Sequence, residues 1–359
     1  MISVGIMQST IADGNEYLNG VAFSLSKKGY EVYCFTPDDY DFNSNKVTGL
    51  LFNNLTSTWL KKSFPLPNFI YDRCFYPISG KGKRSLLSKV ERIKTLTTFI
   101  GEGLPNKWAV HQWLMNNNIL SKYLPPTQLL TNETINSYLS IFHKLVLKPV
   151  NGSGGKGIYF LFNENEKLEL KDGQNRVSRY LNKPEDIFNQ GLPTINHTKY
   201  LIQPYLPLHL ERRPFDFRIV LQKQSLERWY VVGKGFRFGK ENSFLSNLQA
   251  GGIIRPTIKL RKHEKKKILN QIQEIVEHIP GQLEKYHSPL FELGVDLGID
   301  TNHRVWIVEV NSKPGYQTVL DTTDPSNHDH IFHGVGLYIE SIEKKNRARS
   351  LELNVNSKS

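Results

Sequence analysis

Three oxygen-bearing side chains in the last third of the chain, Asp296, Glu309 and Asn311, have types and spacing that suit a magnesium ion. Residues 305–310 alternate as a β-strand does, so Glu309 and Asn311 are expected on the same face. Asp296 belongs to the preceding apolar run, and residues 300–303 favour a turn that folds the two segments into a hairpin. Carboxylate and amide oxygens are ligands that Mg²⁺ takes, usually together with substrate phosphates and water. The cluster therefore predicts a phosphate-binding segment elsewhere in the chain.

A glycine-rich turn between two predicted strands is the first candidate for that segment. Strands at 144–149 and 158–162 flank it, and Ser153 and Lys156 lie within it. Glycine lets backbone N–H groups approach anionic oxygens closely, and these two side chains add donors. The unit differs from Walker A and dinucleotide-binding loops, which must open into a helix. A plain glycine-rich hairpin loop is the alternative. The glycines of the turn are Gly152, Gly154, Gly155 and Gly157.

Two cationic side chains on apolar strands favour the same anion. Lys148 closes a strand in which burial would be costly without a negatively charged partner. Arg218 shares a strand face with Asp216, and the arginine fork suits phosphate or carboxylate. A structural ion pair between the two is the competing interpretation. The strand in segment 200–206 stops at Pro204, which suits a hinge beside an apolar cleft for a flat ring.

The composition is that of an ordinary globular protein with two or three domains. The 359 residues are 39% hydrophobic and 22% charged, and a domain usually takes roughly 100–200 residues. No apolar run reaches the ~20 residues of a membrane span, and residues 1–7 lack the pattern of an export signal. Cys34 and Cys74 carry no metal or disulfide spacing. These features predict a cytoplasmic protein in a reducing compartment.

The net charge of +12 is compatible with acidic partners. Basic residues are densest at 259–267, where we expect a solvated helix start before the apolar positions of 268–276. Attraction to polyanions is the alternative. No helix-turn-helix, zinc-finger or RNA-binding signature accompanies the charge, so nucleic acid is not a predicted partner.

The order of predicted elements separates an N-terminal α/β domain from two further subdomains. Residues 1–100 follow a strand, helix, glycine turn, strand order that favours a parallel, Rossmann-like sheet. One strand ends in Asp72 and Arg73, for which a structural role is favoured over a functional one. Residues 163–195 are predicted to be irregular and residues 268–288 to be helical. The predicted domains are 1–100, 101–205 and 206–345, followed by a polar, mobile tail at 346–359.

Taken in order, these motifs resemble the ATP-grasp superfamily. The most specific match is the acidic hairpin, in which Glu309 follows Asp296 by thirteen positions and opens a Glu-x-Asn-x-x-Pro-Gly segment. More narrowly, residues 71–73, 247–252 and 292–300 resemble the YheC/YheD-type endospore coat-associated proteins. The resemblance implies an α/β and α+β fold, in which an N-terminal α/β domain precedes two α+β subdomains that grip ATP.

The resemblance also implies roles for individual residues. Lys107 and Lys148 would contact phosphates or adenine, the glycine loop would fold over the triphosphate, and the acidic hairpin would hold Mg²⁺. The usual hinge glutamate is absent, so Glu211 is the candidate for the ribose. Arg218 would stabilise the transferring phosphoryl group. The hinge residues expected to meet adenine are Gln203, Pro204, Tyr205 and Leu206. Asn247 would help to position the transferring phosphoryl group, and Arg237 and Lys313 are further anion-facing candidates. The catalytic candidates are thus Arg218, Asn247 and Arg237.

The function implied by the resemblance is a carboxylate–amine ligase that activates a carboxylate as an acyl phosphate with ATP and Mg²⁺. Two alternatives remain: an ATP-grasp phosphotransferase, and an ATP-binding structural component of the spore coat with vestigial chemistry. The motifs do not name the carboxylate or the amine. The basic composition favours an acidic substrate, and the narrower resemblance implies association with coat components.

Overall fold

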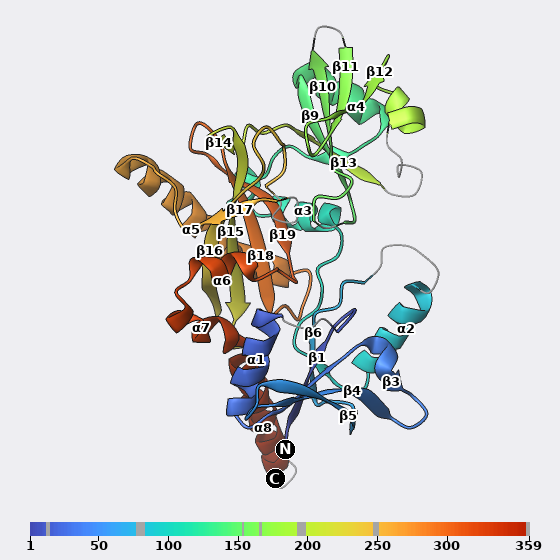
Figure 1. Cartoon of the computed structure of the whole chain (residues 1–359), viewed down its shortest axis with the longest axis vertical. Coiled ribbons are helices and arrows are strands. Elements are labelled where there is room, and N and C mark those ends of the chain that lie inside the picture. The colour runs from blue at the N-terminus through green and yellow to red at the C-terminus, as the bar shows by residue number, and fades with distance from the viewer. Residues whose placement is uncertain are drawn as a thin grey trace.

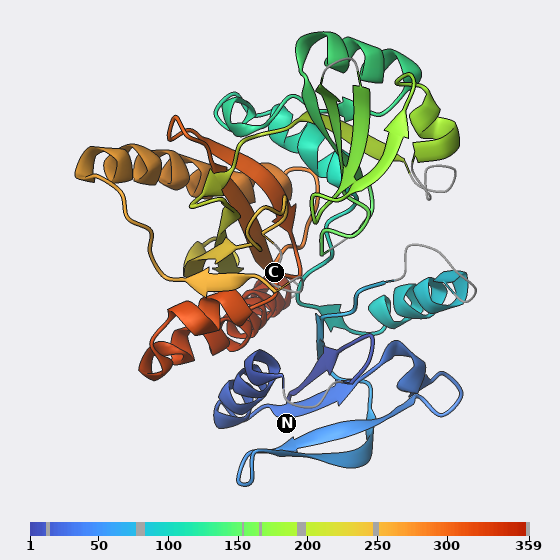
Figure 2. The same cartoon turned by 45° about the horizontal axis from the view of Figure 1, so that its top comes forward.

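The computed structural model describes residues 1–11, 15–76, 83–152, 154–164, 167–191, 199–246 and 251–356. Three β-sheets occupy separate regions of the molecule (Figure 1). The N-terminal sheet lies at the bottom of that view, a second sheet at the top, and the third between them. The turned view in Figure 2 shows the second and third sheets leaning toward one another beside the N-terminal sheet. The fold is therefore mixed α/β and α+β, as expected.

The N-terminal sheet has a parallel core extended by antiparallel strands. Strand β1 pairs in parallel with β2 and β6, and β6 with β7, so the expected parallel pairing of the first two strands is confirmed. Asn15 caps α1 by accepting from the Leu18 N–H at 3.0 Å. Gly29, with a φ of 85°, turns the chain into β2. The elements are β1 (Ser3–Met7), α1 (Glu16–Lys27), β2 (Glu31–Phe35), β3 (Tyr40–Asp41), β4 (Lys46–Asn53), β5 (Thr58–Pro65), β6 (Phe69–Asp72), α2 (Lys83–Lys94) and β7 (Thr98–Phe99).

The second sheet is antiparallel, with strand order β12-β11-β10-β9-β13-β8. Its core contains Ile135 from α4 and Leu145 and Leu147 from β9. The prediction that residues 163–195 are irregular is wrong, because β11 and β12 lie there. Leu168 and Leu170 alternate into the core, a two-residue period that the many polar neighbours obscure. The elements are α3 (Lys107–Met115), β8 (Gln128–Leu129), α4 (Asn132–Ile141), β9 (Lys144–Pro149), β10 (Tyr159–Glu164), β11 (Lys167–Asp172), β12 (Val177–Leu181) and β13 (Tyr200–Pro204).

The third sheet has strand order β17-β16-β15-β18-β19, with β14 paired to the end of β15. One face buries Phe217, Ile219 and Leu221 against the apolar stripe of α5, which includes Ile272 and Ile275. Helix α6 packs on the opposite face of β16. The elements are β14 (His209–Leu210), β15 (Arg213–Lys223), β16 (Trp229–Phe238), β17 (Ile253–Arg255), α5 (Lys262–Glu284), β18 (Glu292–Ile299), β19 (Val305–Asn311) and α6 (Gln317–Thr322).

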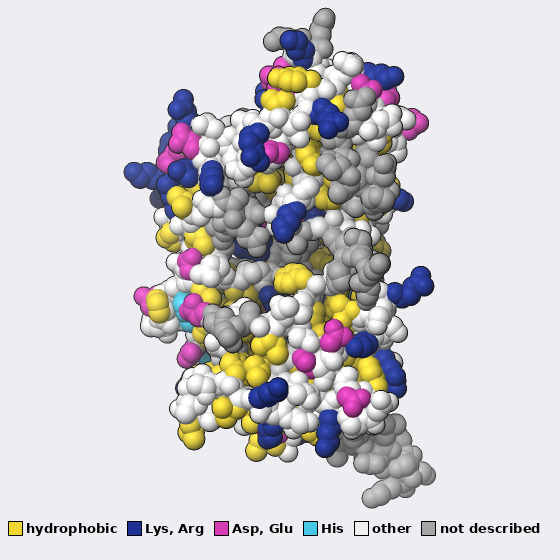
Figure 3. Space-filling model, turned by 45° about the vertical axis from the view of Figure 1, so that its right-hand side comes forward, with side chains coloured by type: hydrophobic (Ala, Val, Ile, Leu, Met, Phe, Trp, Pro, Cys, Tyr) yellow, Lys and Arg dark blue, Asp and Glu magenta, His cyan; other side chains and the backbone are white. Residues whose placement is uncertain are grey.

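Helix α5 begins inside the basic run rather than after it. Its first residue is Lys262, and Arg261 forms an ion pair of 2.5 Å with Glu264. Lys267 donates to the Asn302 carbonyl at 2.8 Å. The basic run is thus the start of a helix, as expected, although the helix starts six residues earlier and ends at Glu284. On the face in Figure 3, Lys and Arg side chains are spread over the surface among acidic ones.

The C-terminal helices return to the N-terminal sheet. Helix α7 spans Asp329–Phe332 and α8 spans Gly334–Asn356. Val335 and Ile339 of α8 share one apolar cluster with Val21 of α1. The segment expected as a polar tail instead continues α8 to residue 356. Among the described residues, no helix is both long and apolar enough to cross a membrane.

Candidate active site

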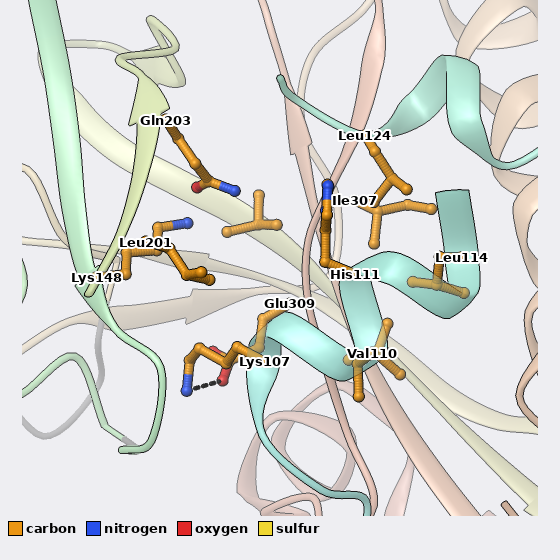
Figure 4. A pocket seen from close by; sticks show the side chains of 12 residues that line it. Lys107, Val110, His111, Leu114, Leu124, Lys148, Leu201, Gln203, Ile307 and Glu309 are labelled. Atoms are coloured by element: carbon orange, nitrogen blue, oxygen red, sulfur yellow. Dashed lines mark ion pairs between the residues drawn. The ribbon is translucent and has the colours of Figure 1, made fainter. Parts of the chain in front are cut away.

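A cleft lies between the second and third sheets, and several of the expected site residues line it. It encloses about 870 Å³, its open mouth included, and a smaller recess of about 460 Å³ adjoins it. Lys107, Lys148, Gln203 and Glu309 line both spaces. Figure 4 shows the recess, with Lys148 projecting from β9 and Lys107 from the start of α3. Side chains from both sheets and from α3 therefore border one continuous space.

A row of charged side chains crosses one face of the third sheet toward this cleft. The register places Asp216 of β15 opposite Arg237 of β16, and Arg218 of β15 opposite Asp296 of β18. Asp296 in turn faces Glu309 of β19. Directly opposed residues of antiparallel strands point to the same face, so strand pairing itself assembles the row.

Two arginines hold Asp296 in place. Arg218 grips both oxygens of Asp296, with its Nη2 2.8 Å from Oδ2. Arg237 places Nη2 2.8 Å from Asp296 Oδ1 and also bonds both oxygens of Asp216, at 2.6 and 2.7 Å. Burial opposes ionisation of Asp296, but Arg218 and Arg237 outweigh it and lower its pKa. Burial raises the pKa of Asp216, which also accepts from the Ser246 hydroxyl.

Two lysines face this row from the other side of the cleft. Lys107 lies 3.0 Å from Glu309 and donates to the Gly152 carbonyl, so it ties β19 to the glycine loop (Figure 4). Burial lowers the pKa of Lys148 to about 8, and Lys107 repels its charge, while Glu309 and Asp296 act in the opposite direction. An ammonium group held at this cost is stabilised when a phosphate enters the cleft.

The glycine loop has a backbone that requires glycine. Gly152, Gly154, Gly155 and Gly157 have φ values of 148°, 66°, 71° and 73°, a region that other residues rarely adopt. Lys156 is exposed on this loop. Ser153 lies outside the described residues. The loop joins β9 to β10 as expected, and the positive φ values by themselves account for its glycines.

The inner end of the cleft is apolar and aromatic. Phe160 and Phe244 rings lie 4.4 Å apart beside Tyr205, while Pro204 and Leu206 line the wall. The side chain of Gln203 lines the cleft and donates to Thr127 at 2.7 Å, and residues 203–206 contain no acidic side chain. The N–H of Tyr205 donates to the Lys144 carbonyl at 2.8 Å. A flat ring fits this environment. The Tyr205 N–H, however, is already hydrogen-bonded to Lys144 and is not available to a ligand.

Not every predicted residue reaches the cleft. Glu211 lies on an exposed turn, 3.2 Å from Arg255, and does not line the cleft. Lys313 turns away to Asp72, at 2.7 Å. Asn247 lies outside the described residues. Arg237 is paired with Asp216 and Asp296 and does not line the cleft. The ribose role of Glu211 and the anion-facing roles of Lys313 and Arg237 therefore lack support from the positions of their side chains.

The sequence interpretation also missed residues that line the cleft. His111 of α3 lines the recess, and burial together with nearby Lys148 lowers its pKa to about 4, so it is neutral at pH 7. Phe244 and Ser246 enter from the loop after β16. His111 could have been predicted from the sequence, because it lies four positions after Lys107 and so on the same face of the helix. No feature of the sequence near Phe244 indicates that it lines the cleft.

The strand register brings the oxygen donors expected for Mg²⁺, Asp296, Glu309 and Asn311, to one face of the third sheet. Asn311 lies two positions after Glu309, opposite Gly294. No group of three or more His, Cys, Asp or Glu suited to a metal occurs in the described part of the chain, so an ion here needs phosphate or water as remaining ligands. That ligand mixture is typical of Mg²⁺ rather than of zinc or calcium.

Gly294 provides the space that lets Arg218 and the segment after β19 meet. A Cβ on Gly294 would lie 2.6 Å from Pro314 Cβ and 3.1 Å from Arg218 Nη1. We expect Gly294→Ala to destabilise the fold by about 1–3 kcal/mol through overpacking. Urea unfolding measures this, with Gly281→Ala as control because a Cβ there meets open space. Equal stability of both variants would contradict the assigned crowding.

Comparison with solved structures defines the class of fold. D-cycloserine synthetase DcsG has a TM-score of 0.55 at 10% identity, over 93% of this chain and 98% of that one. N5-carboxyaminoimidazole synthetase from Staphylococcus aureus complexed with ADP has a TM-score of 0.53 at 12% identity, over 93% and 77%. Two sheets that close on one cleft, together with these likenesses, define an ATP-grasp fold.

The family follows from sequence. The model of the YheC/D-like ATP-grasp family matches residues 96–341. Endospore coat-associated protein YheC of Bacillus subtilis (strain 168) is 31% identical over 345 residues, which are 92% of this chain and 93% of that protein. The chain therefore belongs to the YheC/D-like ATP-grasp family, as the resemblance implied.

Proposed function

We propose that the protein is an ATP- and Mg²⁺-dependent carboxylate–amine ligase that acts through an acyl phosphate. The observation that carries the proposal is the cleft that Glu309 lines together with Lys107 and Lys148. Asp296 and Arg218 follow Glu309 in register across the third sheet. Phosphoryl transfer depends chiefly on positioning and charge neutralisation, and this row supplies both signs of charge on rigid strands. The similar solved structures are named as synthetases, one in complex with ADP.

The chain's own residues would divide the work as follows. Lys148 and Lys107 bind phosphate oxygens, and the glycine loop covers them with backbone N–H groups. The aromatic end of the cleft holds adenine. Arg218 stabilises negative charge on the transferring phosphoryl group with donors fixed in advance by Asp296. Arg237 holds Asp296 and Asp216 in register and so acts as a positioning residue.

Asp296, Glu309 and Asn311 would hold the magnesium ion. When bound, Mg²⁺ supplies charge neutralisation to the triphosphate. In the described structure Glu309 is paired with Lys107 and Asp296 with two arginines. A carboxylate offers about four lone-pair sites, so these pairs leave acceptor capacity for a cation.

The two alternative functions, a phosphotransferase and a structural coat protein, differ from the ligase in what they do with ATP. A phosphotransferase would use the same cleft without a second nucleophile, and a structural coat protein would bind ATP without turnover. The name of the relative YheC, endospore coat-associated protein, favours a place in the spore coat. The intact charged row favours chemistry, because Arg218 and Asp296 are buried at a cost that a purely structural role would relieve by apolar replacement.

The proposal is tested by incubating the protein with Mg-ATP and pools of carboxylates and amines. ADP, phosphate and a new amide mass are expected together. ADP with a phosphorylated acceptor and no amide would instead establish the phosphotransferase. ATP binding without acceptor-dependent turnover, with localisation to a coat layer, would establish the structural role.

The lowered pKa of Lys148 predicts how the affinity for ATP depends on pH. Burial holds its pKa near 8 in the empty cleft, whereas phosphate favours the charged ammonium form. Binding therefore takes up a proton above pH 8, and affinity falls as the pH rises. We expect a constant Kd below about pH 7 and up to roughly tenfold weakening per unit above pH 8.

Isothermal titration calorimetry in two buffers with different ionisation heats measures this proton uptake. Lys148→Met should bind ATP weakly and lose the pH dependence. If the wild-type protein shows no proton uptake at pH 8.5, Lys148 does not contact the phosphates.

A further inference from the structure

The segment immediately after Asn311 is attached residue by residue to the N-terminal part of the chain. Ser312 accepts from the Leu104 N–H at 2.6 Å. Lys313 donates to Asp72 at 2.7 Å and to the Cys74 carbonyl at 2.8 Å. Arg73 donates to the Pro314 carbonyl at 2.7 Å. Three consecutive residues that follow a candidate Mg²⁺ ligand are thus fixed by groups outside the third sheet.

A closed ring of buried hydrogen bonds reinforces these contacts at the interface between the N-terminal and third sheets. Tyr71 and Tyr316 donate to the same oxygen of Glu292, at 2.8 and 2.7 Å, and Arg73 pairs with its other oxygen. Gln222 donates to Tyr316 at 2.7 Å and to Tyr17 at 3.0 Å. The remaining bond of 3.1 Å joins the hydroxyls of Tyr17 and Tyr71.

The polar groups of this ring are not needed merely to hold the two regions together. An apolar cluster already joins the two regions, including Leu18 of α1 with Val220 of β15. Burying Glu292 and Arg73 there costs desolvation that apolar side chains would avoid. Directional bonds fix orientation, and here they fix the backbone at Pro314, three residues after Asn311. Burial raises the pKa of Tyr71 and Tyr316, so both remain donors at neutral pH.

We propose that the N-terminal domain is a working part of the metal site, with Arg73 as the positioning residue that sets the Asn311 segment for Mg²⁺. This inference rests on the proposed function, since it assumes that Asn311 helps to hold the ion. Asp72 and Arg73 end strand β6, so the N-terminal sheet reaches the site through the end of one strand. Residues that orient metal ligands typically change metal affinity by roughly 10-fold to 100-fold when replaced.

The test is the Mg²⁺ concentration required for half-maximal binding of a non-hydrolysable ATP analogue to the full chain. Arg73→Met should raise this midpoint about tenfold or more, while analogue affinity without Mg²⁺ stays unchanged. Arg73→Lys, which keeps the charge, should recover part of the loss. The control is Lys28→Met, which breaks another ion pair of the N-terminal region, the 2.6 Å pair with Glu340 of α8, without touching residues 311–316.

An Arg73→Met midpoint equal to that of the wild type or of Lys28→Met would overturn the inference. If Arg73→Met unfolds, Lys313→Met replaces it, because it removes only the attachment to Asp72 and Cys74, and the same criterion applies. A wild-type protein that binds no Mg²⁺-ATP analogue would instead refute the proposed function. The two failures are therefore separable.

Discussion

Glu309→Gln is expected to lower Mg-ATP turnover by roughly 10³-fold or more, the largest effect among single substitutions of the cleft. The change keeps the shape of the side chain but removes the charge that would hold Mg²⁺ and that now pairs with Lys107 at 3.0 Å. Loss of several kcal/mol of charge stabilisation corresponds to this factor, at about 1.4 kcal/mol for each tenfold change. ATP binding without Mg²⁺ should be retained. ADP release under saturating ATP measures the effect.

The matched control is Glu169→Gln. Glu169 is also a strand glutamate paired with a lysine, 3.1 Å from Lys171, and its side chain is 24% exposed, against 27% for Glu309. It lies on β11 and does not line the cleft. Turnover by this variant should equal that of the wild type. If Glu309→Gln turned over as fast as the wild type, Glu309 would not be a ligand of Mg²⁺.

Arg218→Lys is expected to reduce kcat about 100-fold while the Kd for ATP changes little. Lysine keeps the charge but lacks the fork that grips both oxygens of Asp296. A preorganised donor to a transition-state charge is typically worth roughly 10² to 10³ in kcat. Because Arg237 still pairs with Asp296 at 2.8 Å, the carboxylate is not left without a cation, and the fold should persist.

Single-turnover kinetics with a thermal melt separate chemistry from stability. Arg213→Lys is the control, since Arg213 lies on the same strand but bonds the Gly239 carbonyl instead. A fall in kcat for both variants alike would mean that strand β15, rather than Arg218, is responsible. An unchanged kcat for Arg218→Lys would exclude a role of the fork in the chemical step.

The parts of the site that sequence predicts well are those fixed by local periodicity. Asp216 and Arg218 share a face because they are two apart on one strand, and Asp296 and Glu309 meet because one hairpin joins them. Arg237 could be named as a candidate, but its double pairing depends on the register between β15 and β16. A local pattern does not specify that register.

Contacts between segments that are far apart in the sequence cannot be predicted from local periodicity. Asp72 and Lys313 are 241 positions apart, and nothing near either residue indicates the other. Arg73 and Asp72 do form ion pairs, with Glu292 and Lys313, and the proposed positioning of the Asn311 segment adds a function to these structural contacts. The sequence offers Glu211 only as an acidic residue downstream of the hinge, and it does not indicate the turn that exposes this side chain. Strands β11 and β12 were missed because charged residues mask their short alternation.

The origin of the oxygen in released phosphate tests the acyl-phosphate step most directly. The protein is incubated with Mg-ATP, a pool of amines and a pool of carboxylates labelled with ¹⁸O in both oxygens, and phosphate is analysed by mass spectrometry. Attack of a carboxylate oxygen on the γ-phosphate, followed by amide formation, leaves one labelled oxygen in each phosphate released. The account predicts that labelled phosphate appears with ADP and with the new amide. Acceptor-dependent ADP formation with unlabelled phosphate would contradict it.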